Sequence, residues 1–172
     1  MTYFIQNAHA INELSKGLVA AGFGPFVGSP CDALAPLYEA LDRDVGVLTV
    51  PRDDNAIGIA AGVSLAGGRP AVLLRNSGPG GSAEIIASVV AQHEVAMLLI
   101  VALDSGAADP PAGHQVMVRL SEQVLDGFGI QTVPLDPTTR ADEPIDLVRG
   151  IVCDQLRPAA LLVPFQAFGR QA

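Results

Sequence analysis

Short apolar runs alternate along this chain with stretches that have helical periodicity. The apolar runs are rich in Val, Leu and Ile, and the longest of them, 95–102 (VAMLLIVA), contains no polar residue. Runs of this kind are typical of strands that are buried on both faces of a parallel sheet. The pattern predicts six strands, at 26–28, 45–50, 70–74, 95–102, 131–135 and 159–163.

Each predicted strand is flanked by a predicted helix. In the first helix, Ile11, Leu14 and Leu18 recur at the spacing of one helix face. In the second, Ser29 is placed to cap the helix and Pro30 to occupy its first position, where proline is favoured. The six predicted helices cover 7–21, 30–41, 54–65, 82–92, 116–125 and 145–156.

This alternation of helix and strand predicts the fold class. It is typical of an α/β protein in which a parallel sheet is covered by helices. We therefore expect a single doubly wound domain over residues 1–172, with a six-stranded, mainly parallel sheet and helices on both faces. With 172 residues, 49% of them hydrophobic, the chain is large enough for a full core.

Charge and cysteine content exclude several classes of function. The formal net charge of −8 argues against a surface that neutralises nucleic-acid phosphates. Cys31 and Cys153 lack the spacing of a metal site or a redox pair, so we expect two reduced thiols and no bound metal; a single bridge between the two cysteines is the alternative. We see no signal peptide, and no apolar run approaches the ~20 residues of a membrane span. These features predict a soluble, cytoplasmic protein that binds neither membrane nor nucleic acid.

The candidate chemistry lies in the segment 51–81. Asp53 and Asp54 follow one predicted strand, and the glycine-rich turn 76–81 (NSGPGG) follows the next. Ligands of parallel sheets bind at the carboxyl ends of the strands, where both features fall. Two plainer interpretations stay open, namely that the acids only cap the helix at 54–65 and that 76–81 is an ordinary tight turn.

Two further features suggest contacts outside the core. The helix at 54–65 is built largely of Ala and Gly, which permits close approach either to the sheet or to another chain. The Gly- and Pro-rich segment 105–113 predicts a lid or a contact surface, and His114 and Gln115 directly after it are candidates for substrate contact. A lone loop histidine that is merely exposed is the alternative.

Taken in order, several short motifs resemble a known family. They are GSPCD at 28–32, RDDNAIGIAAG at 52–62, LAG at 65–67 and NSG at 76–78. Together they resemble the pyrimidine-binding (PYR) domain of thiamine-diphosphate enzymes, in particular the branch of phosphonopyruvate and sulfopyruvate decarboxylases. The resemblance implies thiamine diphosphate as cofactor and a carboxy-lyase reaction in which a small 2-oxo acid loses CO2 to give an aldehyde.

The resemblance also assigns roles to individual residues. Asp53 is the catalytic acid, which would hydrogen-bond the N1′ nitrogen of the cofactor's aminopyrimidine ring. The residues expected to bind the cofactor with it are Gly28, Ser29, Pro30, Asn76, Ser77 and Gly78. The residues expected to contact the substrate are Cys31, Asp32, His114 and Gln115.

In this family a second domain, called PP, holds the diphosphate through Mg²⁺ with a Gly-Asp-Gly motif. The chain contains no Gly-Asp-Gly. The resemblance therefore implies a hetero-oligomer in which a separate PP (beta-type) subunit carries the Mg²⁺. Two other functions remain open: a carboligase that joins the same cofactor-bound intermediate to an acceptor aldehyde, and a non-catalytic PYR-like partner that stabilises or regulates another chain.

The sequence departs from the family at the site itself. Asp53 stands where the family has glutamate, so the acid reaches about 1.2–1.5 Å less far. Arg75 stands where the branch has glutamine, and Gly81 where it has asparagine. Of the branch's acidic-proline-glutamine-histidine loop only 109–114 (DPPAGH) remains. These changes weaken the assignment of substrate more than that of cofactor.

Overall fold

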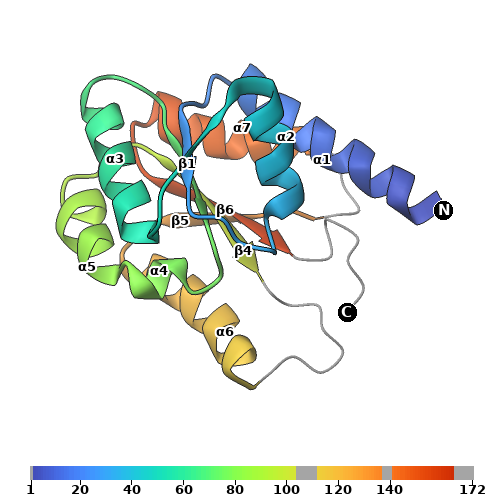
Figure 1. The fold of residues 1–172 in the computed structure, drawn as a ribbon. Helices are drawn as coiled ribbons and strands as arrows, with labels where there is room; N and C mark the ends of the chain where they lie inside the picture. The colour runs from blue at the N-terminus through green and yellow to red at the C-terminus, as the bar shows by residue number, and fades with distance from the viewer. Residues whose placement is uncertain (1, 104–111, 137–140, 165–172) are drawn as a thin grey trace.

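The structure, a computed structural model, describes residues 2–103, 112–136 and 141–164, and the side chains of these ranges except those of 2–8 and 112–119. Six strands form one sheet in the order β2-β1-β3-β4-β6-β5 (Figure 1). Every neighbouring pair is parallel, which confirms the predicted α/β class. The strands are β1 (Phe26–Gly28), β2 (Val47–Thr49), β3 (Ala71–Leu74), β4 (Leu98–Leu103), β5 (Gln131–Pro134) and β6 (Ala159–Pro164).

Helices cover both faces of the sheet, as predicted, and enclose two apolar layers (Figure 1). One layer packs α1, α2 and α7 onto residues such as Phe26 and Leu73, and the other packs α3, η1 and α6 onto residues such as Val72 and Leu99. Because successive strand residues point to opposite faces, the all-apolar strand β4 is buried throughout. The helical segments are α1 (Thr2–Ala20), α2 (Ala35–Val45), α3 (Asp53–Leu65), α4 (Gly78–Gly81), α5 (Ala83–Ile85), the π-helix η1 (Ile86–Ala91), α6 (Ala112–Gly127), α7 (Asp142–Arg149) and the π-helix η2 (Gly150–Asp154).

The strand order creates a crevice between β1 and β3. The chain leaves β1 toward α2 on one face, and it leaves β3 toward α4, which contacts α3 and α6 on the other face. Two adjacent strands whose connections leave in opposite directions form a topological switch point, the usual ligand site of open parallel sheets. The connection from β2 into α3 ends beside this crevice, so three segments of the chain meet there.

The start of α2 differs from the prediction. Ser29 does not cap a helix and Pro30 is not helical; α2 begins at Ala35 after Leu34, with Pro36 in its first turn. Ala35 therefore occupies the first helical position, where proline is favoured, and Pro36 occupies the second. The Ser29 hydroxyl has a tertiary partner instead, described below.

The strand predicted at 45–50 is shorter than expected. Val45 is the last residue of α2, and Gly46, at a φ of +83°, turns the chain into β2. That positive φ is a conformation that glycine adopts without strain. β2 lies at the edge of the sheet, and its Leu48 is half-exposed.

Two other predicted boundaries move. The segment 76–81 is not a simple turn, because it becomes helical at Gly78 and continues through α5 into η1. The helix predicted at 116–125 spans 112–127, so His114 and Gln115 lie in the first turns of α6 rather than in a loop. The proposed lid at 105–113 lies mostly outside the described residues.

The small-residue helix α3 packs on the sheet through one face only. Ala56, Ile57 and Ala60 are fully buried against the second apolar layer. On the rest of the helix Ile59 and Leu65 are exposed, and a Cβ placed on Gly62 would meet nothing within 4 Å. The helix therefore satisfies the intrachain interpretation and still leaves an open apolar face.

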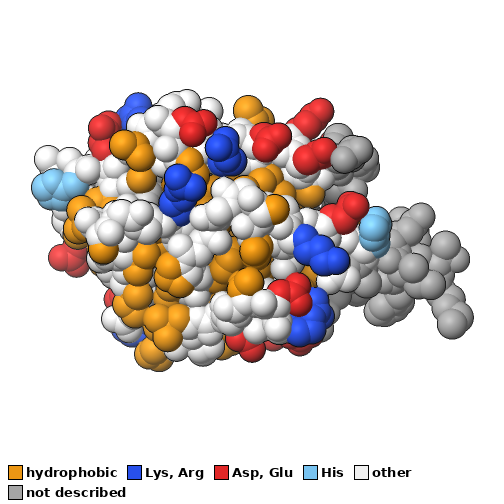
Figure 2. Space-filling model, turned by 90° about the horizontal axis from the view of Figure 1, so that it is seen from above, with side chains coloured by type: hydrophobic (Ala, Val, Ile, Leu, Met, Phe, Trp, Pro, Cys, Tyr) orange, Lys and Arg blue, Asp and Glu red, His pale blue; other side chains and the backbone are white. Residues whose placement is uncertain are grey.

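The surface carries mixed charges. On the face drawn in Figure 2, acidic and basic side chains are interspersed, and hydrophobic side chains gather between them. Among the described residues, no helix is both long and apolar enough to cross a membrane.

Candidate functional site

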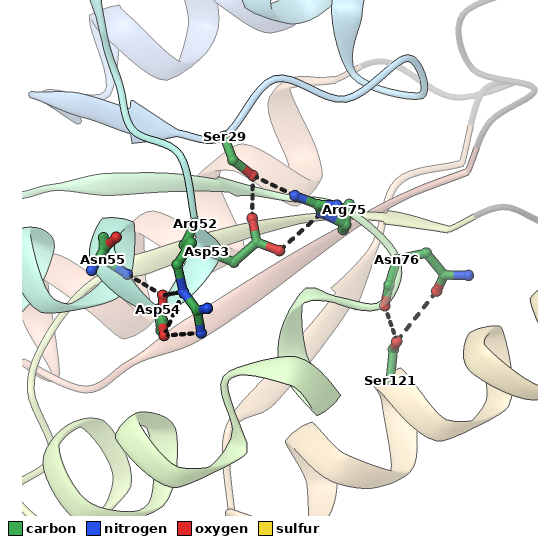
Figure 3. Close-up of polar contacts among 8 residues, drawn as sticks. All are labelled: Ser29, Arg52, Asp53, Asp54, Asn55, Arg75, Asn76 and Ser121. Carbon is green, nitrogen blue, oxygen red and sulfur yellow. Dashed lines mark hydrogen bonds and ion pairs between the residues drawn. The ribbon is translucent and has the colours of Figure 1, made fainter.

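Asp53 is the first residue of α3 and points into the crevice rather than capping its own helix. The residue before the helix is Arg52, in extended conformation, and no side-chain capping hydrogen bond forms. The Asp53 side chain is only 11% exposed and lies over the ends of β1 and β3 (Figure 3). The interpretation of Asp53 as a helix cap is therefore wrong.

Two side chains hold the Asp53 carboxylate. The hydroxyl of Ser29, directly after β1, donates to Oδ1, and Nε of Arg75, directly after β3, lies 3.1 Å from Oδ2. Arg75 Nη2 also donates to Ser29 Oγ over 3.3 Å, which closes the triangle (Figure 3). Ser29, on the β1 side of the cluster, is buried, whereas the guanidinium of Arg75, on the β3 side, is accessible.

The neighbouring acid, Asp54, turns away from this cluster. Its carboxylate binds Arg52 through two nitrogens, with Nη2–Oδ2 at 2.7 Å and Nε–Oδ1 at 2.9 Å, and it accepts the backbone N–H of Asn55. The hydrogen bond with Arg52 lowers the pKa of Asp54, and the same bond raises the pKa of Arg52. Asp54 thus pairs with Arg52 at the surface, whereas Asp53 faces the crevice and binds Ser29 and Arg75.

Two glycines shape the space around the acid. A Cβ on Gly78 would lie 3.2 Å from Asp53 Oδ2 and 3.1 Å from the Cβ of Leu74, closer than side chains usually approach. Glycine at this position therefore allows the backbone to approach the carboxylate closely. Gly28 acts within the sheet, because its Cβ would come within 2.8 Å of the Leu73 Cβ on β3.

A pocket of about 210 Å³ opens beside the cluster. Asp53 and Arg75 form part of its wall, and the buried side chain of Ser82 lines it from the start of α5. Its full lining is Pro51, Arg52, Asp53, Asp54, Arg75, Ser77, Gly81 and Ser82. Asp53 and Ser77 are the two residues predicted from sequence that line it.

Other predicted residues line a second pocket, of about 250 Å³, between the β1 loop and α2. Pro30, Cys31 and Asp32 form one side, and Tyr38 and Glu39 of α2 form the other. Burial raises the pKa of the Cys31 thiol; the charge of Asp53 raises it further and that of Arg75 lowers it. The charges of Asp53 and Arg75 therefore affect the pKa of the Cys31 thiol, although Cys31 lines a different pocket.

Asn76 is directed toward α6. Its backbone carbonyl and its side-chain oxygen both accept the hydroxyl of Ser121, the latter over 3.2 Å (Figure 3). This contact ties the segment after β3 to α6. The side chains of His114 and Gln115 lie outside the described residues, so their predicted contacts with substrate stay predictions.

Arg75 and Ser82 are the site residues that sequence reasoning missed. The sequence marks Arg75 only as a departure from the family. Its pairing with Asp53 depends on the strand order, because β1 lies between β2, which precedes Asp53, and β3, which precedes Arg75. Ser82 was placed in the predicted helix at 82–92 and carried no local signal. Within the described parts of the chain, no group of three or more His, Cys, Asp or Glu side chains is placed to hold a metal ion.

Comparison with known proteins gives a consistent result. The family described as "Thiamine pyrophosphate enzyme, N-terminal TPP binding domain" matches residues 9–126; thiamine pyrophosphate is another name for thiamine diphosphate. Sulfopyruvate decarboxylase subunit alpha of Methanocaldococcus jannaschii is 33% identical over 105 residues, which are 60% of this chain and 62% of that protein. Phosphonopyruvate decarboxylase of Streptomyces viridochromogenes is 30% identical over 118 residues, 66% of this chain and 30% of that one.

A solved structure agrees in fold. The 2-oxoglutarate:ferredoxin oxidoreductase from Magnetococcus marinus superposes with a TM-score of 0.73 over 92% of this chain and 29% of that one, at 11% identity. The matches to sulfopyruvate decarboxylase alpha subunits span 53–62% of those proteins' own length.

Proposed function

We propose a function for this chain from the premise that it belongs to the family of N-terminal TPP-binding domains of thiamine pyrophosphate enzymes. The proposed function is that of the pyrimidine-binding subunit of a thiamine-diphosphate-dependent 2-oxo acid decarboxylase. The observation that carries the proposal is the carboxylate of Asp53. It is nearly buried at the switch point of the sheet, and the backbone at Gly78 passes close beside it. This is where a PYR domain would present its acid to the cofactor.

The residues present fit the aminopyrimidine end of the cofactor. Asp53 Oδ2 lies beside Gly78, where an added Cβ would come within 3.2 Å of it, so glycine lets the backbone pass close to the carboxyl. The shorter acid requires the ring to come about 1.2–1.5 Å closer than glutamate would. Asn76, Ser77 and the β1 loop at 28–30 border the same strand ends and would form the rest of the ring's surroundings.

Thiamine diphosphate supplies the chemistry that stabilises the electrons left when a 2-oxo acid loses CO2. The chain's part is to hold a proton at the pyrimidine N1′ through Asp53 and to keep that carboxyl in place. Ser29 fixes Oδ1, and a misplacement of about 1 Å at such a position can cost on the order of a hundredfold in rate. The buried wall behind Ser29 keeps water from that side of the carboxylate.

The names of the relatives suggest the substrate and the partner. They are sulfopyruvate and phosphonopyruvate decarboxylases, so a 2-oxo acid with a second anionic group is the proposed substrate. Several are called alpha subunits, which favours assembly with a PP-type subunit that holds the diphosphate through Mg²⁺. The domain organisation follows: residues 1–172 as one PYR domain, with the PP domain on a separate chain of the hetero-oligomer.

One contact favours a second candidate function. Arg75 pairs with the same Asp53 oxygen that the cofactor would approach, which would suit a non-catalytic PYR-like partner whose acid is permanently occupied. In that case Asp53 would be dispensable for the activity of the complex. The experiment below separates the two functions.

The test is reconstitution with the PP subunit expected from a neighbouring reading frame. Co-expressed chains, supplied with thiamine diphosphate and Mg²⁺, should release CO2 from sulfopyruvate or phosphonopyruvate. Asp53→Ala should lower kcat by at least about a hundredfold, whereas Asp54→Asn, which changes the adjacent acid that pairs with Arg52, should lose far less. Full activity of the Asp53→Ala complex would overturn the catalytic proposal in favour of the non-catalytic one.

A further inference from the structure

We infer that Arg75 and Ser82 form an oxyanion subsite, which takes one acidic group of a small substrate in the 210 Å³ pocket beside Asp53. The subsite itself is argued from the residues of this pocket. Its assignment to the substrate's phosphonate, sulfonate or carboxylate rests on the proposed function.

Arg75 has donors to spare. Its contacts in the described part of the chain use Nε, toward Asp53, and one N–H of Nη2, toward Ser29. A guanidinium carries five N–H donors in a planar fork that matches oxyanions, so three remain. Since the side chain is 47% exposed and lines the pocket, these donors are accessible to a ligand there.

Ser82 supplies an independent indication of a ligand. The residue is only 3% exposed, yet it lines the same pocket. Its hydroxyl has no hydrogen-bond partner among the described residues, and it is not enclosed in the protein as the hydroxyl of Ser15 is. A nearly buried hydroxyl without a hydrogen-bond partner costs free energy unless a ligand in the neighbouring pocket binds it.

The charges around the pocket favour an anion when Asp53 carries no negative charge. Two carboxylates line it, but Asp54 is already paired with Arg52. Among the described residues, the charge of Arg75 is balanced by Asp53. When the negative charge of Asp53 is removed, as in Asp53→Asn, Arg75 is left with an unbalanced positive charge. Anion binding and neutralisation of Asp53 should therefore favour each other.

The size of the pocket limits what it can take. A volume of about 210 Å³ is below the ~300–1,000 Å³ of sites that hold a whole drug-sized ligand. It suits one end of a small substrate, with the reacting carbon placed toward Asp53. A phosphonate, sulfonate or carboxylate group has the oxygens that an arginine fork and a serine hydroxyl can bind together.

The experiment titrates the full chain with methylphosphonate, methanesulfonate and acetate, and follows the Nε–H signal of Arg75 by NMR. We expect at least one probe to shift this signal saturably, and the strongest probe identifies the acidic group concerned. Arg75→Gln should weaken binding, measured by calorimetry, at least about tenfold, and Ser82→Ala by a smaller factor, about threefold or more. Arg52→Gln is the matched control at the same pocket, and its effect should stay below about twofold.

The decisive variant is Asp53→Asn, which neutralises the acid without changing its shape. It should tighten binding of the best probe several-fold, because it removes the carboxylate that pairs with Arg75. Unchanged affinity in a folded Arg75→Gln chain, or weaker binding in Asp53→Asn, would overturn the subsite. These measurements need neither cofactor nor turnover, so an inactive reconstituted complex would count against the proposed function and leave the subsite standing.

Discussion

Ser29, Asp53 and Arg75 come from three different connections of the fold and meet at one carboxylate. The cluster joins two departures from the family, a shorter acid and a longer basic side chain, in a single contact. Because Ser29 holds one oxygen of the Asp53 carboxylate and Arg75 holds the other, the carboxylate is restricted to one position. The proposed function therefore requires that Arg75 move away from Oδ2 when the cofactor ring approaches this oxygen.

The Cys31 thiol reports on the charge of this cluster. Its pKa is raised first by burial, then by the negative charge of Asp53, and is lowered by Arg75. A raised pKa means that less thiolate is present at neutral pH, so alkylation should begin at higher pH in the folded chain than in urea. In a Cys153→Ser background, the pH midpoint of iodoacetamide reaction should fall with Asp53→Asn and rise with Arg75→Gln. Equal midpoints for the folded and unfolded chains would contradict this prediction.

The element scale shows what the sequence could and could not predict. Strands β3, β4 and β6 were located because a run of buried Val, Leu and Ile is a local signal that the sheet satisfies directly. The start of α2 was misplaced because Ser29 and Pro30 have the local signature of a helix start. The contact that decides the role of Ser29 comes from Asp53, 24 residues away, and no local pattern encodes it.

The same distinction applies to the candidate site. Periodicity places Asp53 and Asp54 together between a strand and a helix, and the family resemblance selects Asp53 as the catalytic acid. The pairing with Arg75 needs the strand order, in which β1 lies between β2 and β3. Sequence alone could therefore name the acid but not its partner.

Gly78 brings the start of α4 close to Asp53, and its replacement tests whether this close approach matters. In Gly78→Ala the added Cβ must push against Asp53 Oδ2 or Leu74, each within 3.2 Å. We expect a loss of about 1 kcal/mol or more of unfolding free energy and roughly tenfold lower activity of the complex. Gly81→Ala in the same helix is the matched control, because its Cβ would meet nothing within 4 Å. Thermal unfolding and the Arg75 Nε–H signal should change in the first variant and not in the second.

At the scale of the whole molecule, the site lies at one end of a helix that is only half covered. α3 begins at Asp53, buries one face against the sheet, and leaves Ile59 and Leu65 exposed at 38% and 76%. Exposed apolar residues on one element that is continuous with a site are typical of a binding surface. We expect the PP subunit to cover this face, since it must bring the rest of the cofactor to Asp53.

A charge on that face should prevent assembly without unfolding the chain. Ile59→Glu adds a carboxylate that would have to be desolvated at an interface, whereas in the free chain it stays in water, so the circular dichroism spectrum and the melting temperature should barely change. Co-purification with the PP subunit should be lost, and with it the binding of thiamine diphosphate measured by calorimetry in the presence of Mg²⁺. Leu147→Glu is the control, because Leu147 is exposed at 60% on α7, which packs on the opposite face of the sheet. If Ile59→Glu still assembled and bound the cofactor as the unmodified chain does, the partner would have to approach Asp53 over another surface, and the exposed face of α3 would need a different occupant.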